Sequence, residues 1–103
     1  MYNLEFLPLA QRDMTEIVSY ISHVLRNPQA AQALADDFIA EAEKLALFPY
    51  AMPVYIPLRP LKHEYRAVFV HNYLMFYTVN EPLKQITVFR VIHAKRDHGK
   101  LLD

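Results

Sequence analysis

The sequence predicts a single α+β domain in which an α-helical hairpin packs on one face of an antiparallel sheet, with elements in the order β-α-α-β-β-β. Two patterns predict this class. Apolar residues recur with helical spacing in the first half of the chain, whereas β-branched and aromatic runs fill the second half. A chain of 103 residues that is 53% hydrophobic is long enough for one core and too short for two. We therefore treat residues 1–103 as one domain.

The first half should contain a short strand and two antiparallel helices. Residues 2–7 alternate as a strand does, and Pro8 suits the first turn of a helix that reaches about residue 25. Asn27 and Pro28 are suitable N-cap and N1 residues for a second helix through about Phe48. The apolar stripes are Met14, Ile17, Val18, Ile21, Val24 and Leu25 in the first helix, and Ala31, Leu34, Ala35, Phe38, Ala42 and Leu45 in the second.

Three strands should follow a proline-rich connection. Four prolines between residues 49 and 60 exclude regular structure there. Strands are predicted at 65–70, 73–79 and 85–92, and the His71-Asn72 pair predicts a tight turn between the first two. These strands should form an antiparallel meander.

Both alternating sets of strand residues are apolar, although the two helices can cover only one face of the sheet. A half-solvated antiparallel sheet normally alternates apolar and polar residues. The second face or a sheet edge should therefore meet a partner chain, unless the C-terminal tail or the proline-rich loop folds over it.

Composition excludes several classes of function. The chain has no cysteine, which rules out disulfides, thiolate metal ligands and a thiol nucleophile. It has one glycine and no GxGxxG, P-loop or HExxH motif, and its five histidines share no compact ligand spacing. We expect neither a cofactor nor a metal. No long apolar run or secretory signal is present, so a cytoplasmic protein without a membrane partner is expected.

Charge is divided unevenly along the chain. Residues 1–50 carry three Lys or Arg and seven Asp or Glu, whereas residues 51–103 carry eight and four. Because local field rather than net charge steers association, the second half suits an anionic partner. The alternative is an uneven scatter of surface charge in a short chain.

The candidate functional residues are basic. Arg66, Arg90 and His93 are the candidates for catalysis, and Arg59, Lys62, His63, Lys95 and Arg96 are the candidates for holding RNA or phosphate. Arginine binds phosphate through a planar fork, lysine adds a point charge, and histidine can exchange a proton near neutral pH. These groups suit metal-free RNA cleavage, in which a base takes the ribose 2′-OH proton and fixed cations stabilise the phosphorane.

This nuclease hypothesis needs Arg66 and Arg90 to open onto a shared hollow. In a regular strand Arg90 lies on the same side as Ile86, Val88 and Ile92, and His93 lies on the other. Arg90 and His93 converge only if the strand ends or bulges near residue 92. In the alternative interpretation Arg90 pairs with a carboxylate such as Glu64, His93 caps the strand, and residues 95–97 form a solvated tail.

Four stretches, in this order and spacing, resemble the RelE/ParE superfamily of bacterial type II toxin–antitoxin toxins. They are LAQRDMTEIVSYI, NPQAAQAL leading to LALFP, YRAVFVHNYLMFYTV and ITVFRVIHAKRD. The resemblance implies a small toxin that a co-expressed antitoxin neutralises in a hetero-oligomer, by wrapping its sheet or active surface.

The superfamily includes two different activities. RelE-like members cut mRNA on the ribosome, and ParE-like members inhibit DNA gyrase by binding it. By resemblance, Arg66 matches the arginine of the second-strand YR motif, Arg90 the last-strand arginine, and His93 a catalytic histidine of some nucleases. The chain departs from several nucleases in having no tyrosine after residue 77. We expect mRNA cleavage, with gyrase inhibition and an inactive, antitoxin-binding protein as the alternatives.

Overall fold

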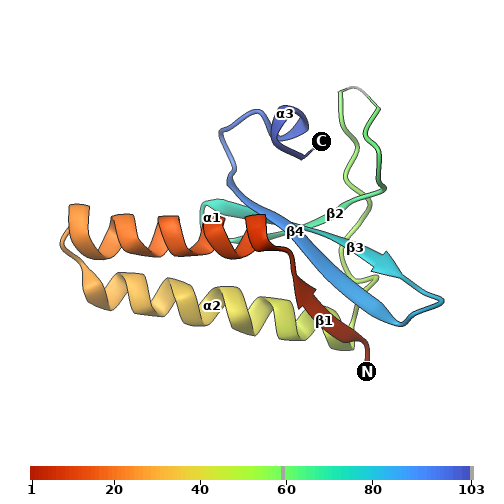
Figure 1. The fold of residues 1–103 in the computed structure, drawn as a ribbon, viewed down its shortest axis with the longest axis horizontal. Coiled ribbons are helices and arrows are strands. Elements are labelled where there is room, and N and C mark those ends of the chain that lie inside the picture. The colour runs from red at the N-terminus through yellow and green to blue at the C-terminus, as the bar shows by residue number, and fades with distance from the viewer. Residues whose placement is uncertain (59, 103) are drawn as a thin grey trace.

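The computed structural model describes residues 1–58 and 60–102, and the predicted phosphate ligand Arg59 lies outside these residues. The elements are β1 (Asn3–Phe6), α1 (Pro8–Ser19), the π-helical segment η1 (Tyr20–Val24), α2 (Pro28–Leu47), β2 (Arg66–Val70), β3 (Tyr73–Asn80), β4 (Gln85–His93) and α3 (His98–Leu102). The α+β class and the predicted order are confirmed, with α3 as an element that the sequence did not predict (Figure 1). No helix among the described residues is long and apolar enough to cross a membrane.

Four strands form one sheet in the order β1-β4-β3-β2. β2, β3 and β4 make the predicted antiparallel meander. β1 does not fit the predicted antiparallel sheet, because it pairs in parallel with β4. Asn3 lies opposite Gln85, and Phe6 lies opposite Val88. The sheet is therefore mixed rather than wholly antiparallel. A parallel pair needs a long connection, and the helical hairpin and two strands that separate β1 from β4 provide one.

The helical hairpin follows the predicted caps and the predicted apolar stripes, except at the end of the first helix. Asn27 accepts a hydrogen bond from the Ala30 N–H at 3.1 Å, and Pro28 begins α2. The first helix changes to π-helical geometry after Ser19, with the Leu25 N–H donating to the Tyr20 carbonyl. A π turn rotates later residues out of the α-helical register. Val24 and Leu25, predicted to be in the apolar stripe, are consequently exposed.

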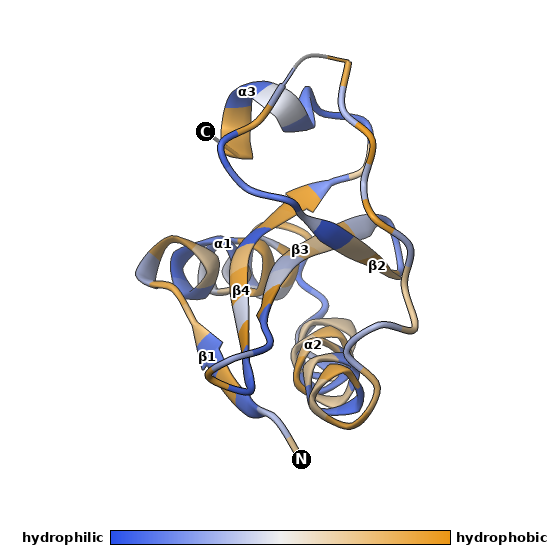
Figure 2. Ribbon diagram, turned by 90° about the vertical axis from the view of Figure 1, so that its right-hand side faces the viewer, coloured by the Kyte–Doolittle hydropathy of each residue, from blue (hydrophilic) through white to orange (hydrophobic). Residues whose placement is uncertain are grey.

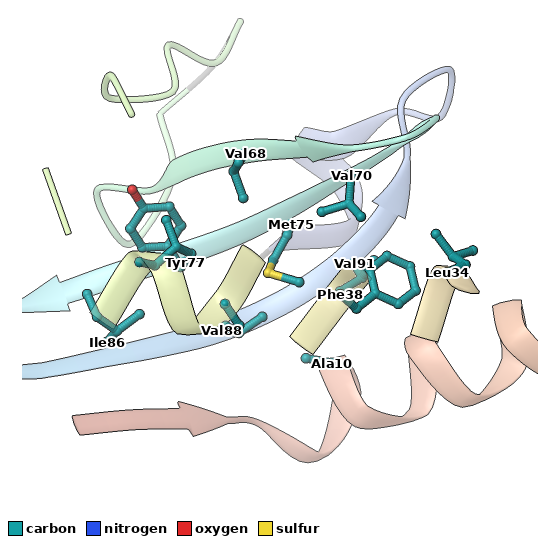
Figure 3. Close-up of a cluster of buried hydrophobic side chains, with 12 residues drawn as sticks. Ala10, Leu34, Phe38, Val68, Val70, Met75, Tyr77, Ile86, Val88 and Val91 are labelled. Carbon is teal, nitrogen blue, oxygen red and sulfur yellow. The ribbon is translucent and has the colours of Figure 1, made fainter. Parts of the chain in front are cut away.

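The main core lies between the helical hairpin and one face of the sheet (Figure 3). Phe38 of α2 is 1% exposed and packs edge-to-face on Tyr73 of β3. The buried side chains of this main core are Ala10, Leu34, Phe38, Ala42, Leu45, Val68, Val70, Met75, Tyr77, Ile86, Val88 and Val91.

A second hydrophobic cluster covers the opposite face of the sheet. Its buried members are Tyr65, Leu74, Phe76, Ile92 and Leu102. The proline-rich loop contributes Tyr55 and Leu61, and α3 contributes Leu101 and Leu102. Figures 1 and 2 show this loop leaving the end of α2 and running to the side of the molecule where α3 lies. The tail and the loop thus cover the face for which the sequence predicted a partner chain, which confirms the alternative.

Tyr77 ties the start of the proline-rich loop to the main core, because its buried hydroxyl donates to the Pro49 carbonyl at 3.0 Å. Replacing Tyr77 by Phe should lower the free energy of unfolding by about 1–2 kcal/mol, since the carbonyl loses its donor. Urea denaturation measures this loss. Tyr20→Phe, at a tyrosine that is 53% exposed, should change stability much less. Equal effects of the two substitutions would contradict the assignment.

Candidate functional site

A β-bulge in β4 decides where Arg90 points. Arg90 pairs with Phe76, but the neighbouring Tyr77 pairs with Val88, so Phe89 is an extra residue in β4. Before the bulge, Ile86 and Val88 face the main core. After it, Arg90 shares the second face with Ile92. The expectation for a regular strand therefore holds for Ile92, whereas the bulge moves Arg90 to the side opposite Ile86 and Val88.

The Arg90 guanidinium is held on three sides. Nε donates to Asp13 Oδ2 at 2.7 Å, Nη2 to Asp13 Oδ1 at 3.0 Å, and Nη1 to the Leu101 carbonyl at 2.8 Å. The two side chains are only 18% and 13% exposed, and the hydrogen bonds with Asp13 raise the pKa of Arg90. Arg90 therefore pairs with a carboxylate, as the alternative interpretation held, but this carboxylate is Asp13 rather than Glu64.

Arg66 lies on the other face of the sheet. It pairs with Tyr77, which faces the main core, whereas Arg90 pairs with Phe76, which faces the second cluster. Neighbouring residues of a strand point to opposite faces. The Arg66 Nη1 donates to the Met52 carbonyl at 2.5 Å, and its Cζ lies 5.0 Å from the centre of the Tyr50 ring. The two arginines thus do not share a hollow.

His93 and Arg96 line a small hollow beside Arg90, together with the carboxylate-bearing Asp13 and Glu16. Its volume is about 110 Å³, below the ~300–1,000 Å³ of ordinary ligand sites. His93 Nδ1 accepts a hydrogen bond from the Lys95 N–H at 3.2 Å, and its ring packs edge-to-face on Tyr73. This contact caps the end of β4, as the alternative interpretation held.

The other predicted ligands divide between two places. His63 lies beside Arg66 in a polar hollow of about 510 Å³, and its ring also contacts Tyr65 and Phe89. Lys62 is exposed in the loop before β2. Lys95 and Arg96 are exposed after β4. The structure brings Arg66 near His63, and Arg90 near His93 and Arg96, but leaves these two groups separate.

Two carboxylates that were not predicted from the sequence, Asp13 and Glu81, organise the two groups. Glu81 accepts hydrogen bonds from the Tyr2 hydroxyl at 2.6 Å and the Tyr50 hydroxyl at 2.5 Å, and it pairs with Lys84. Lys84 and the two hydroxyls lower the pKa of Glu81 to about 2, and the bond to Glu81 raises the pKa of Tyr50 to about 12. The sequence around Glu81 and Asp13 contains no local pattern that predicts their contacts with residues far away in the chain.

No group of three His, Asp or Glu side chains within residues 1–58 and 60–102 could hold a metal ion. The Arg66 and Arg90 guanidinium groups lie on opposite faces of one sheet, and each is bonded to a carboxylate or a carbonyl. Such groups can hold the fold together and present charge at the surface. Their separation does not suit concerted attack on one phosphate.

Two solved structures share this fold. The structure is similar to a chain of the chromosomal ParDE toxin–antitoxin system from P. aeruginosa, with a TM-score of 0.70 and 18% identity, over 92% of this chain and 98% of that chain. It is also similar to a chain of the RelBE2 toxin–antitoxin complex from Mycobacterium tuberculosis, with a TM-score of 0.60 and 20% identity, over 89% and 96%. No curated protein matches the sequence.

The fold is shared with both of these chains. Residues 4–98 match the family described as the ParE toxin of the type II toxin-antitoxin system, parDE. The chain belongs to this ParE toxin family.

The low pKa of Glu81 predicts a specific acid sensitivity. Its carboxylate has an ordinary pKa of 4.5 and a pKa of about 2 in the folded protein, so its contribution to stability is complete above about pH 4.5 and is lost as the pH falls toward 2. The melting temperature of Glu81→Gln should therefore be lower than that of wild type at pH 6, and this difference should shrink below pH 4.5. Glu43→Gln, at an exposed carboxylate of α2, is the matched control. A difference that stays constant with pH would contradict the prediction.

Proposed function

We propose that this protein is a type II toxin that arrests growth by binding DNA gyrase, without cleaving RNA. The observation that supports this proposal is the separation of Arg66 and Arg90 on opposite faces of the sheet, with Arg90 already bonded to Asp13. Stabilising a phosphorane requires donors about 2.7–3.1 Å from the developing oxyanion. Two guanidinium groups on opposite faces cannot meet this requirement at one phosphorus.

A binding toxin needs a recognition surface rather than a catalytic constellation. The proline-rich loop and β2 expose large apolar side chains, with Ile56 87% and Phe69 65% exposed. Protein interfaces commonly centre on such aromatic and aliphatic groups. The sequence pI of about 7.0 also suits a protein partner better than ribosomal RNA, because RNA binding depends strongly on phosphate contacts with a positive surface.

An antitoxin protein is the second proposed partner. The family is one of toxins in two-protein modules, and the two similar structures belong to ParDE and RelBE2 toxin–antitoxin systems. We infer that this chain also forms a hetero-oligomer with its own antitoxin. A short gene for a DNA-binding protein adjacent to the toxin gene is the expected genomic arrangement.

One observation favours the second candidate, ribosome-dependent mRNA cleavage. Arg90, His93 and Arg96 line one hollow and supply cationic and proton-transferring groups. For this hollow to bind phosphate, Arg90 would have to leave Asp13, and the repulsive Asp13 and Glu16 carboxylates would have to move away. The gyrase proposal requires neither change.

The two functions can be separated with induced cells and purified protein. Inducing the toxin in cells without antitoxin should stop growth, and primer extension should show intact translated mRNA. The purified protein should block DNA supercoiling by gyrase. Codon-phased cuts with normal supercoiling would instead establish the nuclease. If neither activity occurs while the antitoxin binds tightly, the chain is an inactive toxin-fold protein and the proposal fails.

Substitution of His93 supplies a residue-level test. Under the gyrase proposal, His93→Ala should retain growth arrest to within about twofold of wild type, because His93 caps a strand and carries no chemistry. A nuclease that uses His93 for proton transfer should lose roughly 10²–10⁴ in activity. His23→Ala, at an exposed histidine of η1, is the control in both cases. Growth curves and supercoiling assays measure the effect.

A further inference from the structure

We propose that Asp13 is a positioning residue that acts through Arg90 to hold helix α3 closed over the second hydrophobic cluster, so that one ion pair controls whether this face is covered. This inference is independent of the toxin's target. It concerns a contact between three elements that are distant in sequence: α1, β4 and α3.

Helix α3 depends on tertiary contacts because it has only five residues. A helix this short is unstable by itself in water. Leu102 is 8% exposed and packs into the second cluster, and the Tyr65 hydroxyl donates to the Leu102 carbonyl at a long 3.3 Å. The shorter bond, at 2.8 Å, comes from Arg90 to the Leu101 carbonyl. This bond places a cation at the C-terminal end of a helix, where unpaired carbonyls and the helix dipole favour it.

Asp13 fixes the direction of this bond. The two bonds from the Arg90 fork to the Asp13 carboxylate orient the guanidinium, so that Nη1 is left pointing at α3. Asp13 also accepts the Val91 N–H at 2.9 Å, beyond the point where β1 stops pairing with β4 at Val88. One carboxylate therefore replaces a missing strand partner and orients the cation that holds α3.

Packing α3 onto the second cluster buries a polar atom of His98 without a hydrogen-bond partner in the part of the chain that the structure describes. This unfavourable burial makes the packed position of α3 depend on the bond from Arg90. The His98 ring lies between α3 and the cluster, 5.4 Å from the Phe76 ring and 6.1 Å from the Tyr55 ring. Its Nε2 atom is buried and has no hydrogen-bond partner among the described residues. Burying an unpaired polar atom is unfavourable, and opening of α3 would hydrate it. Opening would also expose Tyr65, Phe76 and Ile92, which are now 3% exposed or less.

Because the chain has no cysteine, single introduced thiols can report local opening. Leu102→Cys places a thiol on α3 itself, facing the second cluster. The chemically matched Leu45→Cys places one in the main core, where only global unfolding exposes it. In each background, Asp13→Asn removes the charge and keeps the side-chain shape. Glu16→Gln removes a nearby carboxylate of α1 that pairs with Arg12 at the surface.

Asp13→Asn should raise the rate of thiol labelling at position 102 about tenfold or more, with less than a twofold change at position 45. Glu16→Gln should change neither rate. An unchanged rate at position 102, or equal increases at both positions, would overturn the proposal, because Asp13 would then be unimportant or would stabilise the whole fold.

A charge swap separates the positioning role from a purely structural ion pair. Asp13→Arg combined with Arg90→Asp restores the pair but leaves no donor for the Leu101 carbonyl. Labelling at position 102 should stay fast in this variant while its melting temperature recovers relative to the single substitutions. Arg90→Lys is the milder version, because one ammonium group cannot bond both partners in the fork geometry. Slow labelling at position 102 in Arg90→Lys would contradict the proposal.

Discussion

The extra residue at Phe89 in β4 determines which face of the sheet each later residue of this strand occupies. β4 is a central strand, with β1 parallel on one side and β3 antiparallel on the other. Before Phe89 its inward residues fill the main core, and after it the alternation is reversed. The bulge therefore turns Arg90 away from Arg66 and toward α3. At this end of β4 the Asp13 carboxylate, rather than β1, accepts the Val91 N–H.

This arrangement explains how a sheet with two apolar faces exists in a chain of this size. The hairpin of α1 and α2 covers one face with long, regular helices. The other face is covered by segments with little regular structure, the proline-rich loop and α3. Such segments have few backbone hydrogen bonds of their own, so they rely on side-chain contacts such as the bond from Arg90 to the Leu101 carbonyl. The two faces thus differ in how firmly they are covered.

Local signals were sufficient to predict most elements of the fold. Asn27 and Pro28 marked the start of α2, and His71-Asn72 marked a tight turn, because caps and turns depend on neighbouring residues. The π turn at Tyr20 and the bulge at Phe89 were not predicted, since each inserts one residue into a repeating pattern and leaves no mark on composition. The pairing of Asp13 with Arg90 spans 77 positions and depends on the bulge. It therefore could not be predicted from local sequence either.

The candidate site shows why residue types alone do not define catalytic chemistry. Arg66, Arg90 and His93 are suitable for binding phosphate and transferring a proton, and all three are where the sequence suggested, within or at the end of strands. A nuclease also needs these side chains to meet at one phosphate. Whether they do depends on the face of the sheet to which each points and on the groups that already bind each cation. A one-residue bulge reverses the side to which Arg90 points and brings it against Asp13, so this guanidinium is bonded within the fold and lies on the opposite face from Arg66. A toxin that acts by binding tolerates this change, because its surface requires shape and exposed apolar groups rather than cations at one phosphate.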